Sequence, residues 1–326
     1  MMDVGRAAEK IETGTAAVIV VDMGGTKLAG GIANASGQLS ARRTVPTWPT
    51  DGPGGLEALV GMIEALRHAA RRDGMQTRGV GISVAGIVRH DAGVVHLAPN
   101  LRWHDFPLRA VLEERLGLPV TVGNDAKLAT LGEYGVGAGG AGETLFGLWI
   151  GTGVGGGIVV DGRILHGAHD AAGEVAYLLP DRDALRRRYP ALGALELALA
   201  GPGIVGRAAA RLAAAPGMGS VLGDGGGQLR ATDVLAAAQG GDAIASAVLE
   251  ETLDYLALAL ANVATVLDPH RIVIGGAVGL ALVPWYGAII GRLEGRIPHV
   301  PPVFAATLGD AAPLAGAAAS AWERIS

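Results

Sequence analysis

The chain has 326 residues, half of them hydrophobic but only 4% aromatic, with 53 glycines, no cysteine and a formal net charge of −5. This length predicts two domains, and the composition requires cores of Ala, Val, Leu and Ile. The absence of cysteine excludes disulfides, thiolate nucleophiles and cysteine-ligated zinc. The negative net charge means that the chain has no excess of basic residues for binding nucleic acid. We expect residues 1–15 to be a flexible tail, and we find no apolar run that predicts a membrane span.

The first predicted strand is a β-branched, apolar run at 16–21 that places Asp22 at its end. The turn that follows has four residues suited to an anion: Gly24, Gly25, Thr26 and Lys27. The glycines let a phosphate approach backbone N–H groups, and the last two residues add a hydroxyl and a cation. Because a second strand is predicted at 28–33, the residues alone leave a phosphate cradle and an ordinary hairpin turn equally open.

Alternating helices and strands follow: a helix at 55–71, a strand at 80–84, a helix at 108–116 and a strand at 120–122. The last of these strands delivers Asn124 and Asp125 at its C-terminal end, where α/β proteins bind ligands. A helix is predicted from 126 to 134, so that the isolated dipeptide is more readily interpreted as a helix N-cap. Its position between two glycine turns in the chain reverses this preference and favours a ligand-binding site.

The second half repeats the plan of the first hairpin. A strand at 144–150 runs into the glycine turn 151–157, and residues 158–160 return from it. A helix predicted at 250–267 stops before Asp268 and Pro269, and a strand at 271–274 then runs into a third glycine turn at 275–279. Three predicted strands thus each end in a glycine turn. Hairpin turns that occur by chance explain this repeated pattern poorly.

Four motifs in chain order carry a family resemblance: Asp22-Met23-Gly24-Gly25-Thr26-Lys27, Gly123-Asn124-Asp125-Ala126, the 151–157 turn with Gly173-Glu174 downstream, and Leu267-Asp268-Pro269 followed by Ile274-Gly275-Gly276. From about Val18 to the C-terminus the chain resembles the ROK family of sugar kinases and sugar-responsive repressors. The resemblance implies an α/β, two-lobed, actin-like, ribonuclease-H-like (hexokinase-type) fold with a central cleft. We expect a smaller domain at 16–123, a larger one at 124–310, and a C-terminal helix at 311–326 that packs back on the smaller domain.

The resemblance also implies roles for individual residues. Asp125 is the general base that takes the proton from the attacking sugar hydroxyl, and Asp22 orients Mg²⁺, through water. The residues expected to hold ATP are Asp22, Gly24, Gly25, Thr26, Lys27, Gly151, Thr152, Gly153, Gly275, Gly276 and Ala277. Those expected at the sugar are Ser83, Gly86, Asn100, Asn124, Asp125, Glu174, Tyr177 and Glu196. Taken singly, Glu174 and Glu196 are also compatible with surface carboxylates, and Asn100 with a turn residue.

The chain departs from the family at its structural zinc. The positions of the family's histidine and three cysteine ligands match Tyr177, Arg187, Tyr189 and Ala194, none of which is a normal zinc ligand. We therefore expect no zinc, and a loop held instead by packing of Tyr177, Leu185, Tyr189 and Leu192. His166 and His169 predict no other metal site, and Arg186, Arg187 and Arg188 predict a solvated helix face. Tyr177 also changes the sugar pocket, which makes plain glucose a less secure substrate.

The function expected from the resemblance is an ATP-dependent kinase that phosphorylates the primary (6-type) hydroxyl of glucose, mannose or an amino sugar. The alternative acceptors are 3-amino-glucose or a C7 cyclitol, and polyphosphate stays open as a donor. A repressor needs an N-terminal DNA-binding domain, for which about 15 residues before the first strand are too few. A silent sugar-binding relative would not need the phosphate-binding residues. We expect a cytoplasmic homodimer with no nucleic-acid or membrane partner.

Overall fold

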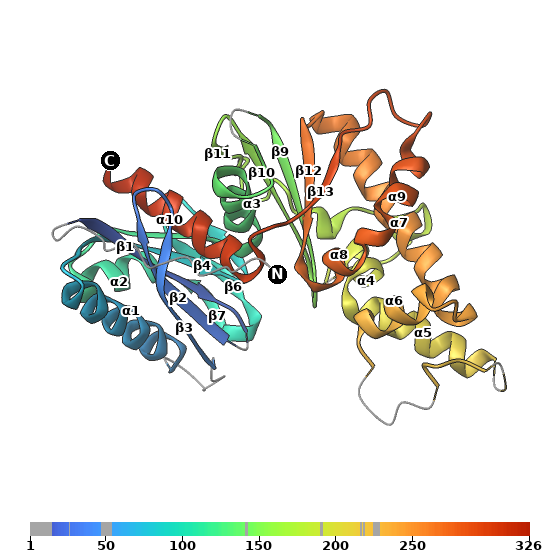
Figure 1. Ribbon diagram of the computed structural model, residues 1–326, viewed down its shortest axis with the longest axis horizontal. Helices are drawn as coiled ribbons and strands as arrows, with labels where there is room; N and C mark the ends of the chain where they lie inside the picture. Colours follow the sequence, from blue (N-terminus) through green and yellow to red (C-terminus); the bar gives the residue numbers. More distant parts are fainter. Residues whose placement is uncertain are drawn as a thin grey trace, which may run out of the picture. The chain divides into compact units, whose positions relative to one another are not determined.

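The computed structural model describes residues 15–25, 27–46, 54–140, 143–189, 192–215, 217, 219–223 and 229–326. Contacts divide the chain into two compact units. Unit 1 is formed by Met1–Asp125 with Leu314–Ser326, and unit 2 by Ala126–Pro313. Each unit is a mixed α/β body with its own hydrophobic core (Figure 1).

Unit 1 is built on a five-stranded sheet with strand order β3-β2-β1-β4-β8. Its elements are β1 (Ala16–Met23), β2 (Lys27–Asn34), β3 (Leu39–Pro46), α1 (Gly54–Arg72), β4 (Gln76–Val84), β5 (Ile87–Arg89), β6 (Val94–Ala98), the 3₁₀ helix η1 (Pro99–Leu101), β7 (Trp103–Phe106), α2 (Leu108–Leu116), β8 (Val120–Asn124) and α10 (Ala312–Ile325). Strands β1, β4 and β8 are parallel, whereas β2 pairs antiparallel with β1 and β3. Strands β5, β6 and β7 form a small antiparallel sheet.

The two faces of this sheet are covered by different helices. Successive residues of a strand point to opposite faces. In β4, Val80 and Ile82 join the core with α1 and α2, whereas Gly79 and Gly81 face α10. A Cβ on Gly81 would lie 2.2 Å from the carbonyl oxygen of Ala317, so only glycine lets α10 approach this strand so closely. Trp322 also ties α10 to unit 1 by donating Nε1–H to Asn34 O at 3.0 Å.

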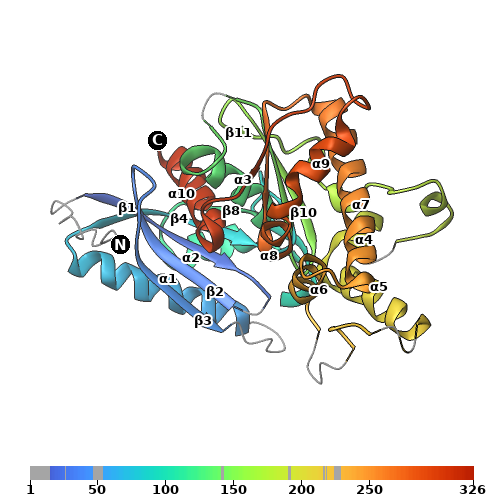
Figure 2. The same cartoon turned by 45° about the vertical axis from the view of Figure 1, so that its right-hand side comes forward.

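Unit 2 repeats the same sheet plan in the order β11-β10-β9-β12-β13 (Figure 1), with β9, β12 and β13 parallel. Figure 2 shows β10 and β11 of this sheet from a second direction. Its elements are α3 (Asp125–Val136), β9 (Leu145–Ile150), β10 (Val154–Val160), β11 (Arg163–Ile164), η2 (Val175–Tyr177), η3 (Asp183–Arg186), α4 (Ala194–Leu199), α5 (Gly201–Ala214), α6 (Ala231–Gln239), α7 (Ala243–Leu267), β12 (Arg271–Gly275), α8 (Gly276–Ala281), η4 (Val283–Trp285), α9 (Tyr286–Leu293), β13 (Val303–Ala305) and η5 (Gly309–Ala311). The predicted repetition of the first hairpin is confirmed.

The strands of unit 2 also separate two cores. Ile272 and Ile274 of β12 pack with the helices from α4 to α9, whereas Val273 packs on the opposite face with Leu131 of α3. Two sequence predictions need correction here. The segment 275–279, predicted as a glycine turn, is mostly helical, because α8 begins at Gly276. Helix α7 begins at Ala243 rather than at residue 250.

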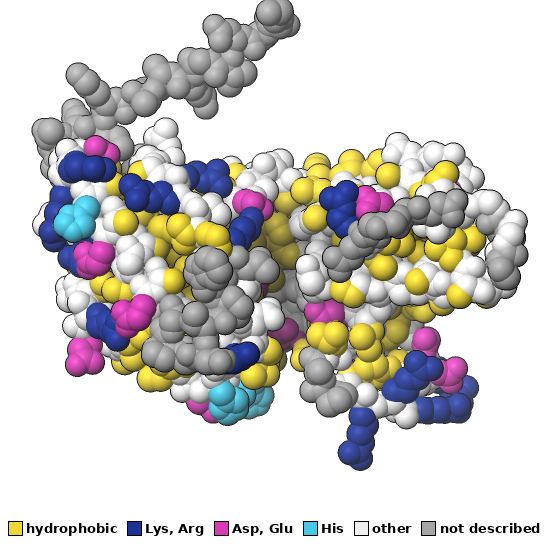
Figure 3. Space-filling model, turned by 90° about the horizontal axis from the view of Figure 1, so that it is seen from below, with side chains coloured by type: hydrophobic (Ala, Val, Ile, Leu, Met, Phe, Trp, Pro, Cys, Tyr) yellow, Lys and Arg dark blue, Asp and Glu magenta, His cyan; other side chains and the backbone are white. Residues whose placement is uncertain are grey.

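The surface carries charges of both signs. Acidic and basic side chains are interspersed with apolar ones on the face that Figure 3 shows. Among the described residues, no helix combines the length and the apolar character that crossing a bilayer requires.

Candidate active site

Three parallel strands of unit 1 end at one edge of the sheet, where α/β proteins bind ligands. Asp22 of β1 pairs with Ser83 of β4, and Ser83 pairs with Gly123 of β8. The Ser83 side chain is fully buried, and its hydroxyl donates to Asp22 Oδ1 at 2.5 Å. This short bond to a carboxylate fixes the orientation of Asp22.

Asn124 and Asp125 stand at the same edge. Asn124 Nδ2 donates to the carbonyl oxygen of Gly86 at 2.9 Å and to Asp125 Oδ1 at 3.1 Å. Asp125 is the first residue of α3, where the positive end of the helix dipole favours a carboxylate. The strand end, the helix start and the Gly86 turn together hold a half-buried acid in one orientation.

The β1–β2 turn lies against the segment that carries Asn100. The N–H of Gly24 donates to Lys27 O at 3.0 Å and closes the turn. A Cβ on Gly25 would lie 2.9 Å from both Cβ and Nδ2 of Asn100, so glycine is needed for this approach. Asn100 and Lys27 are both exposed, and Thr26 lies outside the described residues.

In unit 2 the second glycine turn meets the β12–α8 junction and the start of α5. The N–H of Gly151 donates to Gly153 O at 2.9 Å, and the N–H of Gly201 donates to Gly151 O at 2.8 Å. Gly276 has a φ of +79°, and a Cβ there would lie 2.3 Å from Ile150 O. A Cβ on Gly275 would enter the Trp149 ring. Thr152 and Ala277 are exposed beside these glycines.

Two glutamates and a buried lysine form a charged cluster in unit 2. Glu196 on α4 accepts a hydrogen bond from Val154 N–H at 3.1 Å through Oε1. Burial raises the pKa of Glu174 above its usual range; the charge of Lys127 opposes this shift and that of Glu196 adds to it. Burial likewise lowers the pKa of Lys127, and Glu174 and Asp170 oppose that shift. The Lys127 ammonium donates to the main-chain oxygen of Asp170.

Neither Lys127 nor Asp170 was among the site residues predicted from the sequence. A lysine inside the otherwise apolar start of the predicted helix 126–134 was the available signal for the first. Asp170 gave no signal of this kind, because the hydrogen bond that it accepts from Lys127 is to its backbone oxygen and any residue could provide that oxygen.

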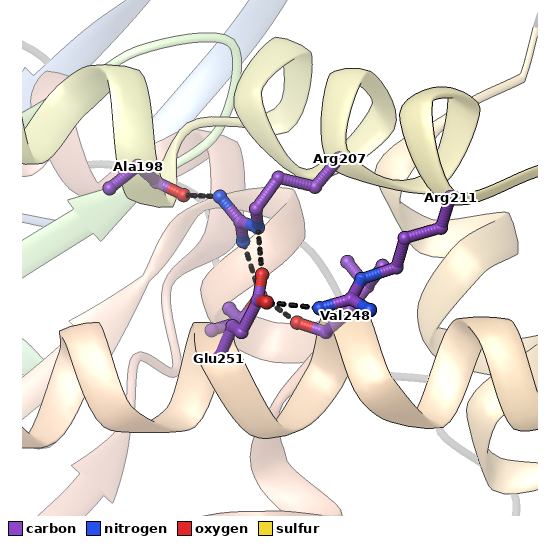
Figure 4. A network of polar contacts seen from close by, with 6 residues as sticks. Ala198, Arg207, Arg211, Val248 and Glu251 are labelled. Carbon is purple, nitrogen blue, oxygen red and sulfur yellow. Dashed lines mark hydrogen bonds and ion pairs between the residues drawn. The ribbon is translucent and has the colours of Figure 1, made fainter. Parts of the chain in front are cut away.

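A half-buried arginine supports the short helix that carries Glu196 (Figure 4). Arg207 of α5 donates through Nη1 to Ala198 O at 2.5 Å, and its Nε lies 3.2 Å from Glu251 Oε2 on α7. Arg211 forms a second ion pair with Glu251. Helix α4 spans only Ala194–Leu199, so the hydrogen bond from Arg207 to Ala198 O stabilises it where its own hydrogen bonds do not suffice.

Comparison with known proteins identifies the family. The model of the ROK family matches residues 18–324. The chain belongs to the ROK family. It is 36% identical to the glucokinase of Halalkalibacterium halodurans over 270 aligned residues, and this aligned region covers 80% of each chain. It is 33% identical over 265 residues to the N-acetylmannosamine kinase of Citrobacter koseri, covering 81% of this chain and 84% of that protein.

Solved structures agree. The ROK family glucokinase from Streptomyces griseus, in complex with glucose and AMPPNP, is 32% identical with a TM-score of 0.78, covering 94% of this chain and 99% of that one. The fold is therefore the predicted two-lobed α/β fold of the actin-like, hexokinase type.

This ROK chain lacks the cysteines of the family's zinc motif. The predicted packing of the corresponding loop is wrong, because Tyr177, Leu185 and Leu192 are 50%, 70% and 48% exposed. Backbone contacts hold the segment instead: a Cβ on Gly193 would lie 2.0 Å from Ala176 O. At its centre Asp181 Oδ1 accepts from Ala184 N–H at 2.8 Å.

The basic run at 186–188 in the same segment is exposed, as predicted. It lies on no helix face, however, because the short η3 ends at Arg186.

Proposed function

We propose that this protein is an ATP-dependent sugar kinase that transfers the γ-phosphoryl group to the primary (6-type) hydroxyl of a hexose, with Asp125 as general base. Membership of the ROK family and the similarity to sugar kinases support the reaction class. The observation that carries the assignment of the base is the position of Asp125, which combines a strand end, a helix N-terminus and a hydrogen bond from Asn124.

The chemistry demands little beyond this arrangement. The hydroxyl oxygen attacks the γ-phosphorus, the bond from that phosphorus to the β–γ bridging oxygen breaks, and Asp125 accepts the hydroxyl proton. Phosphoryl transfer depends mainly on positioning and on charge neutralisation, and a general base contributes roughly 10²–10⁴-fold. By orienting the carboxylate, Asn124 places one acceptor atom where the proton leaves.

The glycine turns suit the donor. A Cβ on Gly151 would meet nothing within 4 Å, so the turn faces open space that a phosphate group can enter. Gly275 and Gly276, by contrast, leave no room for side chains, as expected where backbone must approach closely. We propose that Gly24, Gly25, Thr26, Lys27, Gly151, Thr152 and Gly153 bind the phosphates and that Gly275, Gly276 and Ala277 border the adenosine.

Asp22 suits Mg²⁺, because carboxylate oxygen is a preferred ligand and a bound water can bridge the two. When bound, the ion supplies positive charge that offsets the phosphates. The hydroxyl of Ser83 already donates to Asp22, so we infer that Ser83 acts on this carboxylate rather than on the sugar.

On the acceptor side we propose Gly86, Asn100, Asn124, Glu174, Tyr177 and Glu196. Each carboxylate can accept two sugar hydroxyls. Glucose, mannose and N-acetylated or free amino sugars are the candidate acceptors. We further propose that the enzyme works without zinc, as a cytoplasmic homodimer.

A coupled ADP-release assay with ATP and Mg²⁺ tests this function against glucose, mannose, glucosamine, N-acetylmannosamine, 3-amino-glucose and a C7 cyclitol. We expect one acceptor to raise ADP release well above hydrolysis by water, with NMR locating the phosphate on the primary hydroxyl. Replacing ATP by polyphosphate and measuring the sugar phosphate directly tests the donor, because this reaction releases no ADP. If no acceptor stimulates ADP release, the proposed function is wrong.

A further inference from the structure

Lys127 is a charged side chain in an interior position. It is 3% exposed, and no other lysine or arginine among the described residues is as deeply buried. Lysine is almost never fully buried unless it is paired. The side chain projects from α3 two residues after Asp125, and its ammonium donates to Asp170 O. This chain therefore carries the cost of a buried cation on the helix that begins with its proposed base.

The partner of Lys127 lies in the loop that carries Glu174. This loop runs from the end of β11 to η2, and three of its residues have positive φ: Gly167 at +77°, Asp170 at +56° and Gly173 at +83°. For a residue with a side chain, such as Asp170, this conformation is uncommon. At the C-terminal end of the loop, a Cβ on Gly156 would lie 2.5 Å from Gly173 O. The loop is thus tied to β10 at one point and to α3 at another.

The charges near Lys127 and Glu174 come from two elements. Glu174 and Asp170 belong to the loop, Glu196 belongs to α4, and His166 lies 3.2 Å from Asp170 within the loop. The charge of Glu196 adds to the cost of ionising Glu174, which burial already makes unfavourable. A buried cation next to Glu174 reduces that repulsion because charges interact strongly away from water.

We propose that Lys127 is a positioning residue for the sugar: it links the helix that begins at Asp125 to the Glu174 loop and balances the paired carboxylates of Glu174 and Glu196. The inference rests on the proposed function, in which those two glutamates bind acceptor hydroxyls. A protonated glutamate loses acceptor capacity, so loss of Lys127 weakens acceptor binding and leaves ATP binding in place.

The test measures kcat and both KM values from pH 5.5 to 9 for four variants: Lys127→Met, Lys127→Gln, Lys127→Arg and the exposed control Arg296→Met. We expect Lys127→Met to raise the acceptor KM about tenfold at neutral pH, to leave the ATP KM within about twofold, and to recover affinity as the pH rises. Lys127→Gln keeps an N–H donor for Asp170 O but not the charge, and should show the same pH displacement. Lys127→Arg keeps the charge and should retain the wild-type pH profile.

The outcomes separate the two proposals. One outcome is that the wild-type enzyme phosphorylates a sugar while the acceptor KM of Lys127→Met and Lys127→Gln follows the wild-type pH profile. That result overturns the role of Lys127 but not the proposed function. A wild-type protein that phosphorylates no sugar overturns both proposals. If Lys127→Met does not fold, the pH profile of the acceptor KM for Lys127→Gln is compared with that of wild type instead. In a Glu174→Gln background, Lys127→Gln should cause no further pH displacement, because the group that Lys127 acts on is gone.

Discussion

Replacing Glu133 by alanine should destabilise unit 2 strongly. Glu133 is fully buried on α3, and its carboxylate accepts hydrogen bonds from the N–H groups of Ala138, Thr307 and Leu308, each at 2.8 Å. The hydroxyl of Thr307 donates to it as well, at 3.1 Å. One side chain therefore satisfies three backbone amides and a hydroxyl where α3 meets the segment after β13.

The expected cost follows from these four donors. An unsatisfied buried donor costs about 1–3 kcal/mol, and relaxation shared among neighbouring donors keeps the total near that of a broken buried ion pair, about 3–5 kcal/mol. For a unit of this size the melting temperature should fall by about 6–20 °C. Glu133→Gln keeps the shape and one carbonyl oxygen but turns an NH₂ group toward a donor, so we expect a loss of about 1–3 kcal/mol.

Urea unfolding and scanning calorimetry measure both quantities. Glu294→Gln, at an exposed residue, is the matched control and should change stability by no more than about 0.5 kcal/mol. If Glu133→Ala unfolds within about 1 kcal/mol of wild type, the carboxylate is not the structural centre of this junction.

Three further results are expected. Because the folded-state pKa of Glu174 lies above its ordinary 4.5, the acceptor KM should rise as pH falls through that raised pKa, and Glu174→Gln should remove this inflection. Gly276→Ala should raise the ATP KM far more than the acceptor KM, since its Cβ would strike Ile150 O, whereas Gly287→Ala in open space should be near neutral. Elemental analysis of protein purified without chelators should find well under one equivalent of zinc; a stoichiometric amount would refute the proposed zinc-free loop.

Much of the fold could be predicted because its strands are continuous apolar runs and its helices have clear periodicity. Helix α2 has the predicted bounds, since Leu108, Leu112 and Leu116 recur at helical spacing and all three are buried. The first two turns of α7 were missed because the residues from 243 to 249 are nearly all apolar or small and give no contrast between faces.

The candidate site was predictable only in part. Strand ends and glycine turns marked Asp22 and Asp125, but hydrogen bonds between distant residues leave no local pattern, so neither the Ser83–Asp22 bond nor the support of Lys127 could be foreseen. The packing predicted for Leu185 and Leu192 failed because an apolar residue type does not by itself determine burial.

The most direct test of the central claim compares Asp125→Asn with wild type in two measurements, kcat for the sugar acceptor and the calorimetric affinity for that sugar without ATP. We predict that kcat falls by roughly 10²–10⁴-fold, because the amide cannot accept the hydroxyl proton, while sugar affinity changes by only a few fold. An Asp125→Asn enzyme that turns over at the wild-type rate would contradict the assignment of Asp125 as the base.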